Sequence, residues 1–221
     1  MSSSGPAYRD RSGRTLAEYP RPSVAVDTAV LTIAGTGALA VLLVADGDGA
    51  ASAGSGLRLP GTFLHEGETL SAAVLRSMRE KAGVPGLAPR QLHVFDDPAR
   101  DERGWVLSVA HLDVVRRERI SASARARLVP VDAVPALPFD HGVIVGFAAE
   151  ELRVAYRGRP DPWGLVDRPF TMRELRRVHE AVAGERLLPD TFRRAMLPWL
   201  RATGEKVQTG RGRPAELYAD G

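Results

Sequence analysis

The stretch from Leu59 to Val84 constrains the fold more than any other part of the sequence, because it places a chain break, a helix and a helix stop in a fixed order. Pro60 and Gly61 interrupt regular structure. Apolar residues then recur at helical spacing, namely Leu70, Val74, Leu75 and Met78. Gly83 is the residue type that most often caps a helix C-terminus. The stretch predicts a phosphate-handling loop followed by a helix that lies against a sheet.

The same stretch resembles the box that defines the Nudix hydrolases. Glu68, Arg76, Met78, Gly83 and Val84 match that pattern, and its leading glycine falls on Thr62, one place after Gly61. The three carboxylates of the pattern's helix fall on Ser77, Glu80 and Lys81, so one of the three remains.

The missing carboxylates bear on the chemistry that the resemblance implies. Glutamates on one helix face hold divalent metal against a pyrophosphate in this family. The hydroxyl of Ser77 is a poor ligand for Mg²⁺, and the ammonium of Lys81 repels the ion. We therefore expect a vestigial box with no catalytic residue, metal ion or cofactor, in which Glu68 and Arg76 form a structural pair and Glu80 is a surface residue. The alternative is an active hydrolase of ADP-ribose or another nucleoside diphosphate derivative, which uses Mg²⁺ at Glu80.

Composition limits the class of protein. The 221 residues are 44% hydrophobic and 26% charged, as in soluble globular proteins, and they include no cysteine, which excludes disulfides and fits a cytoplasmic setting. Residues 1–22 are polar and predict a disordered tail without a signal peptide. The apolar run from Ala29 to Ala45 contains two glycines and two threonines, so it predicts two strands rather than a membrane span.

The first 158 residues predict an α/β unit with a mixed sheet. Strands are expected at Val24–Val44, as a hairpin turning at Gly35–Gly37, and at Gln91–Phe95, Trp105–Val115 and Leu128–Val134. Asp140 is the expected cap of a helix whose apolar face holds Val143, Ile144, Phe147, Ala148, Leu152 and Ala155. Asp46–Gly56 predicts a flexible loop, and His93, His111 and His141 lack metal-ligand spacing.

The segment from Val94 to Val115 is similar to the loop and strand that follow the box in the Nudix branch that handles ADP-ribose. That similarity implies that Arg103 donates to a phosphate and that Trp105 stacks on a base or sugar. With Gly61 they are the expected ligand-binding residues. A core position for Trp105 is the alternative.

A second unit is predicted after a linker at residues 159–169. Thr171 and Glu174 form a capping-box signature, and Phe170 and Leu175 stand where a hydrophobic staple is expected. That helix extends to Gly184. The next is expected from about Asp190, burying Phe192 and Met196 and stopping before Pro198. Thr203–Ala219 predicts a hairpin with a glycine and arginine tip.

Two helices followed by a basic hairpin are typical of a winged helix-turn-helix. Six Lys or Arg residues and one acid lie between positions 193 and 213. We expect double-stranded DNA to meet Arg193 and Arg194 on the second helix, Lys206 on the hairpin, and Arg211 and Arg213 at its tip. The alternative is that these basic residues are solvated and have no role in DNA binding.

The whole arrangement resembles the Nudix-related transcriptional regulators, over about residues 24–219. It implies a tail at 1–22, a Nudix-type ligand-sensing sandwich at 23–158, a linker at 159–169 and a small winged helix domain at 170–221. It also implies a homodimer, away from membranes, that binds a two-fold DNA operator and responds to a nucleotide such as ADP-ribose, controlling NAD or sugar metabolism. The competing hypotheses are the active hydrolase and a Nudix-fold binding protein that neither cuts nor regulates.

Overall fold

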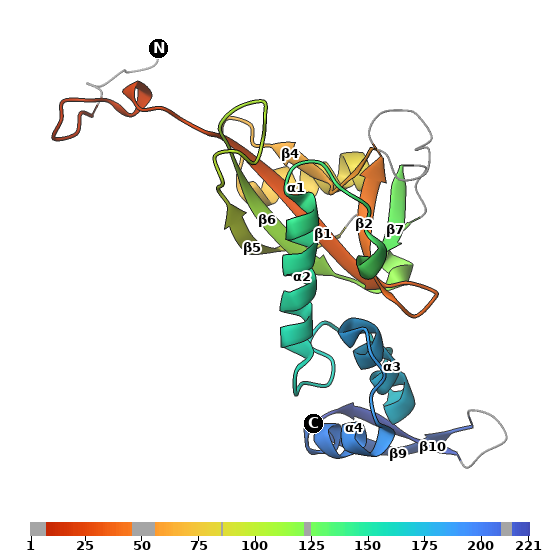
Figure 1. Cartoon of the computed structure of the whole chain (residues 1–221). Helices are drawn as coiled ribbons and strands as arrows, with labels where there is room; N and C mark the ends of the chain where they lie inside the picture. The colour runs from red at the N-terminus through yellow and green to blue at the C-terminus, as the bar shows by residue number, and fades with distance from the viewer. Residues whose placement is uncertain (1–7, 46–55, 85, 122–124, 209–213) are drawn as a thin grey trace.

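The protein is built on a mixed sheet whose longest strand, β1 (Ser23–Ile33), lies at its centre (Figure 1). The computed structural model describes residues 8–45, 56–84, 86–121, 125–208 and 214–221. Strand order is β3-β2-β1-β6-β5, with β1 parallel to β6 and antiparallel to β2. The bounds are β2 Leu39–Ala45, β3 Leu57–Arg58, β5 Arg90–Phe95 and β6 Val106–Val114. The mixed sheet, the β1–β2 hairpin and the strand at β6 agree with the predictions.

Two short strands complete this sheet. β4 (Gly61–Phe63) pairs with the first half of β1, whereas β2 pairs with its last three residues. β7 (Ala126–Pro130) pairs with β2, and the 3-10 turn η4 (Val131–Ala133) follows it. The predicted strand at 128–134 therefore begins earlier and ends at Pro130. The loop prediction for 46–56 lies outside the described residues except for Gly56.

Alternating side chains of the sheet form two apolar layers, as expected for a sandwich. Val26 and Val30 of β1 face helix α1 (Leu70–Ser77), while Ala29 and Leu31 face helix α2 (His141–Tyr156). Both layers are fully buried around β1. Figure 1 shows α2 crossing in front of the sheet and continuing beyond it toward the C-terminal helices.

Helix α1 begins and ends as the sequence pattern predicts, although its buried face differs. The Thr69 hydroxyl accepts a hydrogen bond from the Ala72 amide at its start. The π-helical turn η2 (Met78–Ala82) extends α1, and Gly83, at a φ of 66°, ends it. Leu75 is exposed rather than part of the core face, and Ala73 is buried there with Val74 and Met78.

Helix α2 starts after Asp140, but the predicted side-chain cap is wrong. The Asp140 carboxylate makes no capping hydrogen bond because Arg100 binds it. The buried face holds Ile144, Val145, Ala148, Ala149, Leu152 and Tyr156. Val143 and Phe147, predicted to be on this face, are 63% and 40% exposed. The helix is apolar nearly all round, so spacing alone does not define its inner side.

The C-terminal unit has the predicted order of elements. It contains β8 (Phe170–Thr171), α3 (Met172–Ala183), α4 (Pro189–Met196), the 3-10 turn η5 (Leu197–Trp199), β9 (Leu200–Val207) and β10 (Ala215–Asp220). The sheet order is β8-β10-β9, and all pairs are antiparallel. Its core is formed by Val166, Phe170, Leu175, Phe192, Met196 and Tyr218.

The capping box at Thr171 is confirmed. Its hydroxyl accepts from the Glu174 amide at 3.2 Å, while the Glu174 carboxylate accepts from the Thr171 amide at 2.7 Å. Both Phe170 and Leu175 are fully buried, in keeping with the predicted staple. Gly184, at a φ of 77°, ends the helix.

The segment between the two units is held at several points. Its buried Asp161 accepts hydrogen bonds from the Tyr156 hydroxyl at 2.7 Å and from two backbone amides. Arg116, next to the 3-10 turn η3 (Arg117–Arg119), donates to the carbonyls of Gly164 and Val166 and pairs with Asp167. These contacts fix the connection to the end of β6.

Residues 8–22, which precede β1, extend away from the sheet (Figure 1). They include a 3-10 turn, η1 (Leu16–Glu18), with a capping box between Thr15 and Glu18. Among the described residues, no helix combines the length and apolar content that a membrane crossing requires.

Candidate functional site

A polar cavity opens at one end of the first sheet, where β1, β4, the loop before β6 and the start of α2 meet. Its volume is about 170 Å³. The lining includes four cationic side chains, Arg58, Lys81, Arg100 and Arg103, and two carboxylates, Asp27 and Asp101. The space suits a small anionic group, since pockets that enclose whole drug-sized ligands measure about 300–1,000 Å³.

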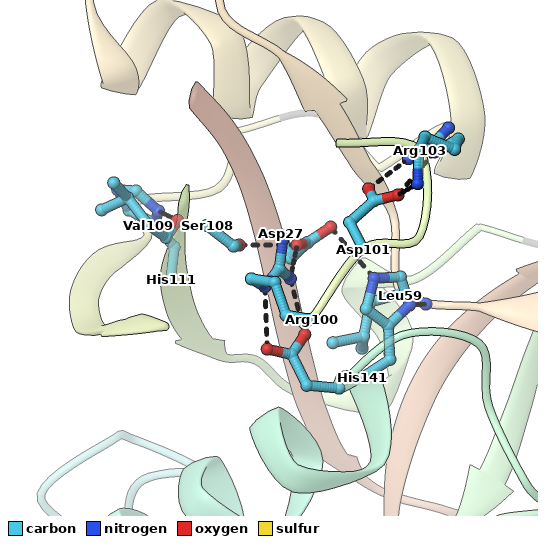
Figure 2. A network of polar contacts seen from close by, with 10 residues as sticks. Asp27, Leu59, Arg100, Asp101, Arg103, Ser108, Val109, His111 and His141 are labelled. Carbon is cyan, nitrogen blue, oxygen red and sulfur yellow. Dashed lines mark hydrogen bonds and ion pairs between the residues drawn. The ribbon is translucent and has the colours of Figure 1, made fainter. Parts of the chain in front are cut away.

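Asp27 is the buried centre of the polar network in Figure 2. Its carboxylate accepts a 2.6 Å hydrogen bond from the Ser108 hydroxyl and lies 3.3 Å from His141 Nε2. Burial acts to raise the pKa of Asp27, but His141, Ser108 and Arg100 together hold it below its ordinary value. The Leu59 amide donates to His141 Nδ1, so Nε2 carries the proton that faces Asp27.

Arg100 ties the loop before β6 to the start of α2. Its guanidinium donates to both oxygens of Asp140, at 2.8 and 2.5 Å, and lies 3.6 Å from Asp27. Only 3% of the Arg100 side chain is exposed. A bidentate pair of this kind fixes orientation as well as charge.

Arg103 lies at the mouth of the cavity. It donates to both oxygens of the buried Asp101, and this hydrogen bonding lowers the pKa of Asp101 to about 2. The Arg103 guanidinium lies 4.8 Å from the ring centre of Phe139 and 5.5 Å from that of Phe63. Phe139 has a φ of 56°, a conformation that bulky residues rarely adopt. The rim is therefore aromatic and cationic.

Glu68 and Arg76 of the box form a structural pair and do not line the cavity. Arg76 donates to both oxygens of Glu68 at 2.9 and 2.8 Å, and also to the Thr62 hydroxyl and the Phe63 carbonyl. Hydrogen bonds from Arg76 lower the pKa of Glu68 to about 2. This pair ties β4 to α1, as expected. Glu80 is exposed, and it does not line the cavity.

Metal ligands are not gathered at this site. Ser77 is fully buried and its hydroxyl has no hydrogen-bond partner, while Lys81 enters the cavity and donates to the Gly61 carbonyl. Over the described ranges, no three His, Cys, Asp or Glu side chains form a group that could hold a metal ion. The side chains present do not fit the Mg²⁺ site that the resemblance implies.

Two of the three predicted ligand residues, Gly61 and Arg103, line the cavity. Trp105 is 50% exposed and outside the lining, so the core alternative for it is wrong. The sequence pattern did not identify Asp27, Arg58, Arg100, Phe139 or His141. A lone acid within the apolar stretch 24–33 is a signal that points to Asp27.

The predicted DNA-contacting residues lie on exposed surfaces of the C-terminal unit. Arg193 and Arg194 are exposed on α4, between the buried Phe192 and Met196 in the sequence, and Lys206 is exposed on β9. The Arg193 guanidinium lies 5.9 Å from the Tyr218 ring centre. Arg211 and Arg213 lie outside the described residues.

A larger basic cleft lies between the β1–β2 turn and α3, and the sequence pattern did not reveal it. Its volume is about 1150 Å³. Five arginines line it, Arg153, Arg173, Arg176, Arg177 and Arg186, together with three acids. This cleft therefore places a second group of positive charges between α3 and the first sheet.

Comparisons with known proteins agree with both units. Residues 162–219 match the family described as the NrtR DNA-binding winged helix domain. The chain is 28% identical, over 91% of its length and 83% of the relative's, to the ADPR responsive transcriptional repressor NtrR of Acinetobacter baylyi.

Solved structures of similar proteins agree with these matches. Shewanella oneidensis NrtR complexed with a 27mer DNA is 31% identical, with a TM-score of 0.69 over 90% of this chain and 93% of that one. The NUDIX domain of the same protein complexed with ADP ribose is 27% identical, with a TM-score of 0.52 over 64% of this chain and 95% of that one. The first unit therefore has the Nudix fold, and the second is a winged helix.

Proposed function

Because the chain belongs to the NrtR family of Nudix-related transcriptional regulators, we propose that it binds an operator through α4 and the β9–β10 wing and releases or tightens on it when ADP-ribose enters the cavity. The observation that carries this proposal is the presence, in one chain, of a cationic cavity and an exposed arginine-bearing helix. The relatives that are described as ADP-ribose-responsive or DNA-bound support it. The target genes we propose are those of NAD metabolism, in the cytoplasm.

Thermodynamic linkage limits how much the ligand can change the affinity of the protein for DNA. ADP-ribose changes operator affinity only by as much as it binds the two arrangements of the protein differently, typically about 1–3 kcal/mol or about 5- to 150-fold. The test is fluorescence anisotropy with a labelled duplex from upstream of the protein's own gene, titrated with and without ADP-ribose. A salt-dependent complex whose Kd moves at least about fivefold with ligand is expected. Absence of any complex at low salt contradicts the proposal.

We also propose that the cavity senses its ligand without cutting it and needs no cofactor. The carboxylates in the cavity are already committed, Asp27 to Ser108 and His141, and Asp101 to Arg103. Chromatography of ADP-ribose incubated with protein and Mg²⁺ should show no AMP above the protein-free control. Mg²⁺-dependent AMP that disappears in the Glu80→Gln variant would establish the hydrolase alternative instead.

A homodimer is the assembly we propose, since a closed two-fold pair matches a two-fold operator. The exposed apolar side of α2, formed by Val143, Phe147 and Val154, is the surface we assign to it. This side also carries Glu150 and Arg157, so it offers both charges to a second copy. Light scattering should give twice the chain mass for the wild type and the monomer mass for Val143→Glu/Val154→Glu. Exposed Leu188→Glu is the matched control and should stay dimeric.

A further inference from the structure

Lys81 occupies the position where the family pattern has a metal-holding glutamate. Its side chain is half-buried, enters the cavity from η2 and donates to the Gly61 carbonyl. We propose that the Lys81 ammonium, together with the Arg58 guanidinium beside it, takes the place of a divalent metal and holds the diphosphate of the nucleotide ligand. Binding is then independent of Mg²⁺. This inference rests on the proposed function, because it assigns the anion-binding group of the same site.

Gly61 fixes where this ammonium lies. Asp27 and Gly61 are paired across β1 and β4, and a Cβ at position 61 would lie 2.0 Å from Asp27 Oδ1. The absent side chain lets the Gly61 backbone approach Asp27 closely and turn its carbonyl to Lys81. The ammonium is therefore held at the cavity wall by a backbone group, without an ion pair to any carboxylate that the structure describes.

Lys81 has donors left for a ligand. An ammonium carries three N–H groups, and one of them is used on the Gly61 carbonyl. The carboxylates that line the cavity do not take the others, because Asp27 is bound by Ser108 and His141 and Asp101 by Arg103. Two donors can meet phosphate oxygens.

The cations of this wall repel one another. Burial and the neighbouring Arg58 lower the pKa of Lys81, and burial and Arg103 lower the pKa of Arg58, although Asp27 partly offsets both effects. Each like-charged neighbour disfavours the charged form of Lys81, and an anion that enters the cavity favours it. A diphosphate relieves this repulsion, whereas Mg²⁺ increases it.

The size of the cavity agrees with this assignment. Its volume of about 170 Å³ accepts a diphosphate but leaves the rest of a nucleotide to the rim of Arg103, Phe63 and Phe139. Inorganic diphosphate and a nucleotide diphosphate ester share this chemistry, so both are used as probes.

The first experiment needs no variant, because Lys81 and Lys206 are the only two lysines of the chain. The wild-type protein is treated with an amine-acetylating reagent in EDTA, and acetylation at each lysine is measured by mass spectrometry. ADP-ribose is expected to reduce labelling of Lys81 at least about tenfold at saturation while Lys206, on β9, reacts as before. Labelling of Lys81 that is unchanged by saturating ADP-ribose in EDTA, with calorimetry showing the ligand bound, overturns the inference but leaves the proposed function intact.

The second experiment measures affinity by calorimetry in EDTA and in Mg²⁺. The wild-type Kd for ADP-ribose should agree within about twofold between the two buffers. Lys81→Met should weaken binding about ten- to a hundredfold, the effect of a hydrogen bond to a charged group, and Lys81→Arg should retain most of it. Arg79→Met, at an exposed position of the same turn η2, is the matched control and should bind ADP-ribose as the wild type does. Binding that requires Mg²⁺, or a folded Lys81→Met variant with wild-type affinity, overturns the assignment.

Inorganic diphosphate tests the anion site separately from the proposed nucleotide ligand. If it protects Lys81 while ADP-ribose neither binds nor affects DNA affinity, the anion site stands and the proposed ligand is wrong. If neither compound protects Lys81, the anion site itself is wrong.

Discussion

Asp27 and Gly61 show how two residues set the shape of the ligand cavity. They face each other across β1 and β4, and the contact is possible because position 61 has no side chain. The Asp27 carboxylate can then reach Ser108 on one side and His141 on the other. A single methyl group at position 61 would displace this buried carboxylate.

Gly61→Ala should lower the free energy of unfolding by about 1–3 kcal/mol, as overpacking usually does, and should weaken ADP-ribose binding. Urea denaturation and calorimetry measure the two effects. Gly146→Ala is the control, since a Cβ there meets no atom within 4 Å, and alanine favours a helix interior. Equal stability of Gly61→Ala and the wild type would contradict the close contact with Asp27.

Glu68 should give the protein an acid-sensitive stability. Its pKa is about 2 when folded, against an ordinary value of 4.5, because Arg76 hydrogen-bonds to the ionised form. A carboxyl group with a depressed folded pKa stabilises above its unfolded pKa, and that contribution is lost as pH falls from about 4.5 to about 2.

Glu68→Gln should therefore flatten the dependence of the urea midpoint on pH in this window. Glu80→Gln is the matched control, because Glu80 is an exposed glutamate of the neighbouring turn η2. A Glu68→Gln profile that parallels the wild type would show that the pair with Arg76 does not contribute.

Among the elements, those with local signals were predictable and those set by distant partners were not. The Thr171 capping box, the Gly83 cap and the β1–β2 hairpin follow from neighbouring residues, and all three are present. The start of α2 depends instead on Arg100, 40 residues away, which takes the Asp140 carboxylate from its expected capping role. His141 likewise enters the site because β1 brings Asp27 to it. Such pairings depend on the tertiary fold and carry no periodicity.

Helix α4 is the element that we expect to contact the phosphates of the operator. Arg193→Ala and Arg194→Ala should each weaken operator binding and reduce the slope of log Kd against log salt by about one, as loss of a phosphate contact does. Anisotropy titrations from low to moderate salt measure both quantities. Arg79→Ala, at an exposed position of η2 in the first unit, is the control and should keep the wild-type slope. Wild-type binding by the Arg193→Ala/Arg194→Ala double variant would move the DNA surface away from α4.

At the scale of the whole molecule, β6 joins the cavity to the C-terminal unit. Ser108 near its start binds Asp27, and Arg116 just beyond its end binds the carbonyls of Gly164 and Val166. Arg90 on the adjacent strand lies 3.8 Å from the ring centre of Trp163 in the same connection. A change around Asp27 thus has a continuous path of packed and hydrogen-bonded groups to the winged helix.

Arg116→Ala should abolish the effect of ADP-ribose on the affinity for the operator. Its separate affinities for ADP-ribose and for the operator should stay within about threefold of the wild type, while the effect of one on the other falls toward none. The measurement is the operator Kd at zero and saturating ADP-ribose. Neighbouring Arg117, which donates to the local Ile120 carbonyl and to no group of the connection that the structure describes, provides the control variant Arg117→Ala. Full coupling in Arg116→Ala would exclude this connection as the route.

The backbone conformation of Phe139 lowers the stability of the protein, while its ring contributes to the ligand site. A bulky residue at a φ of 56° is strained, by about 1–3 kcal/mol for residues in such regions, and glycine would relieve that strain. Yet the ring of Phe139 lies against the Arg103 guanidinium at the cavity mouth. Directed evolution for heat resistance alone should therefore select glycine here and yield a sturdier regulator that discriminates its metabolite less well.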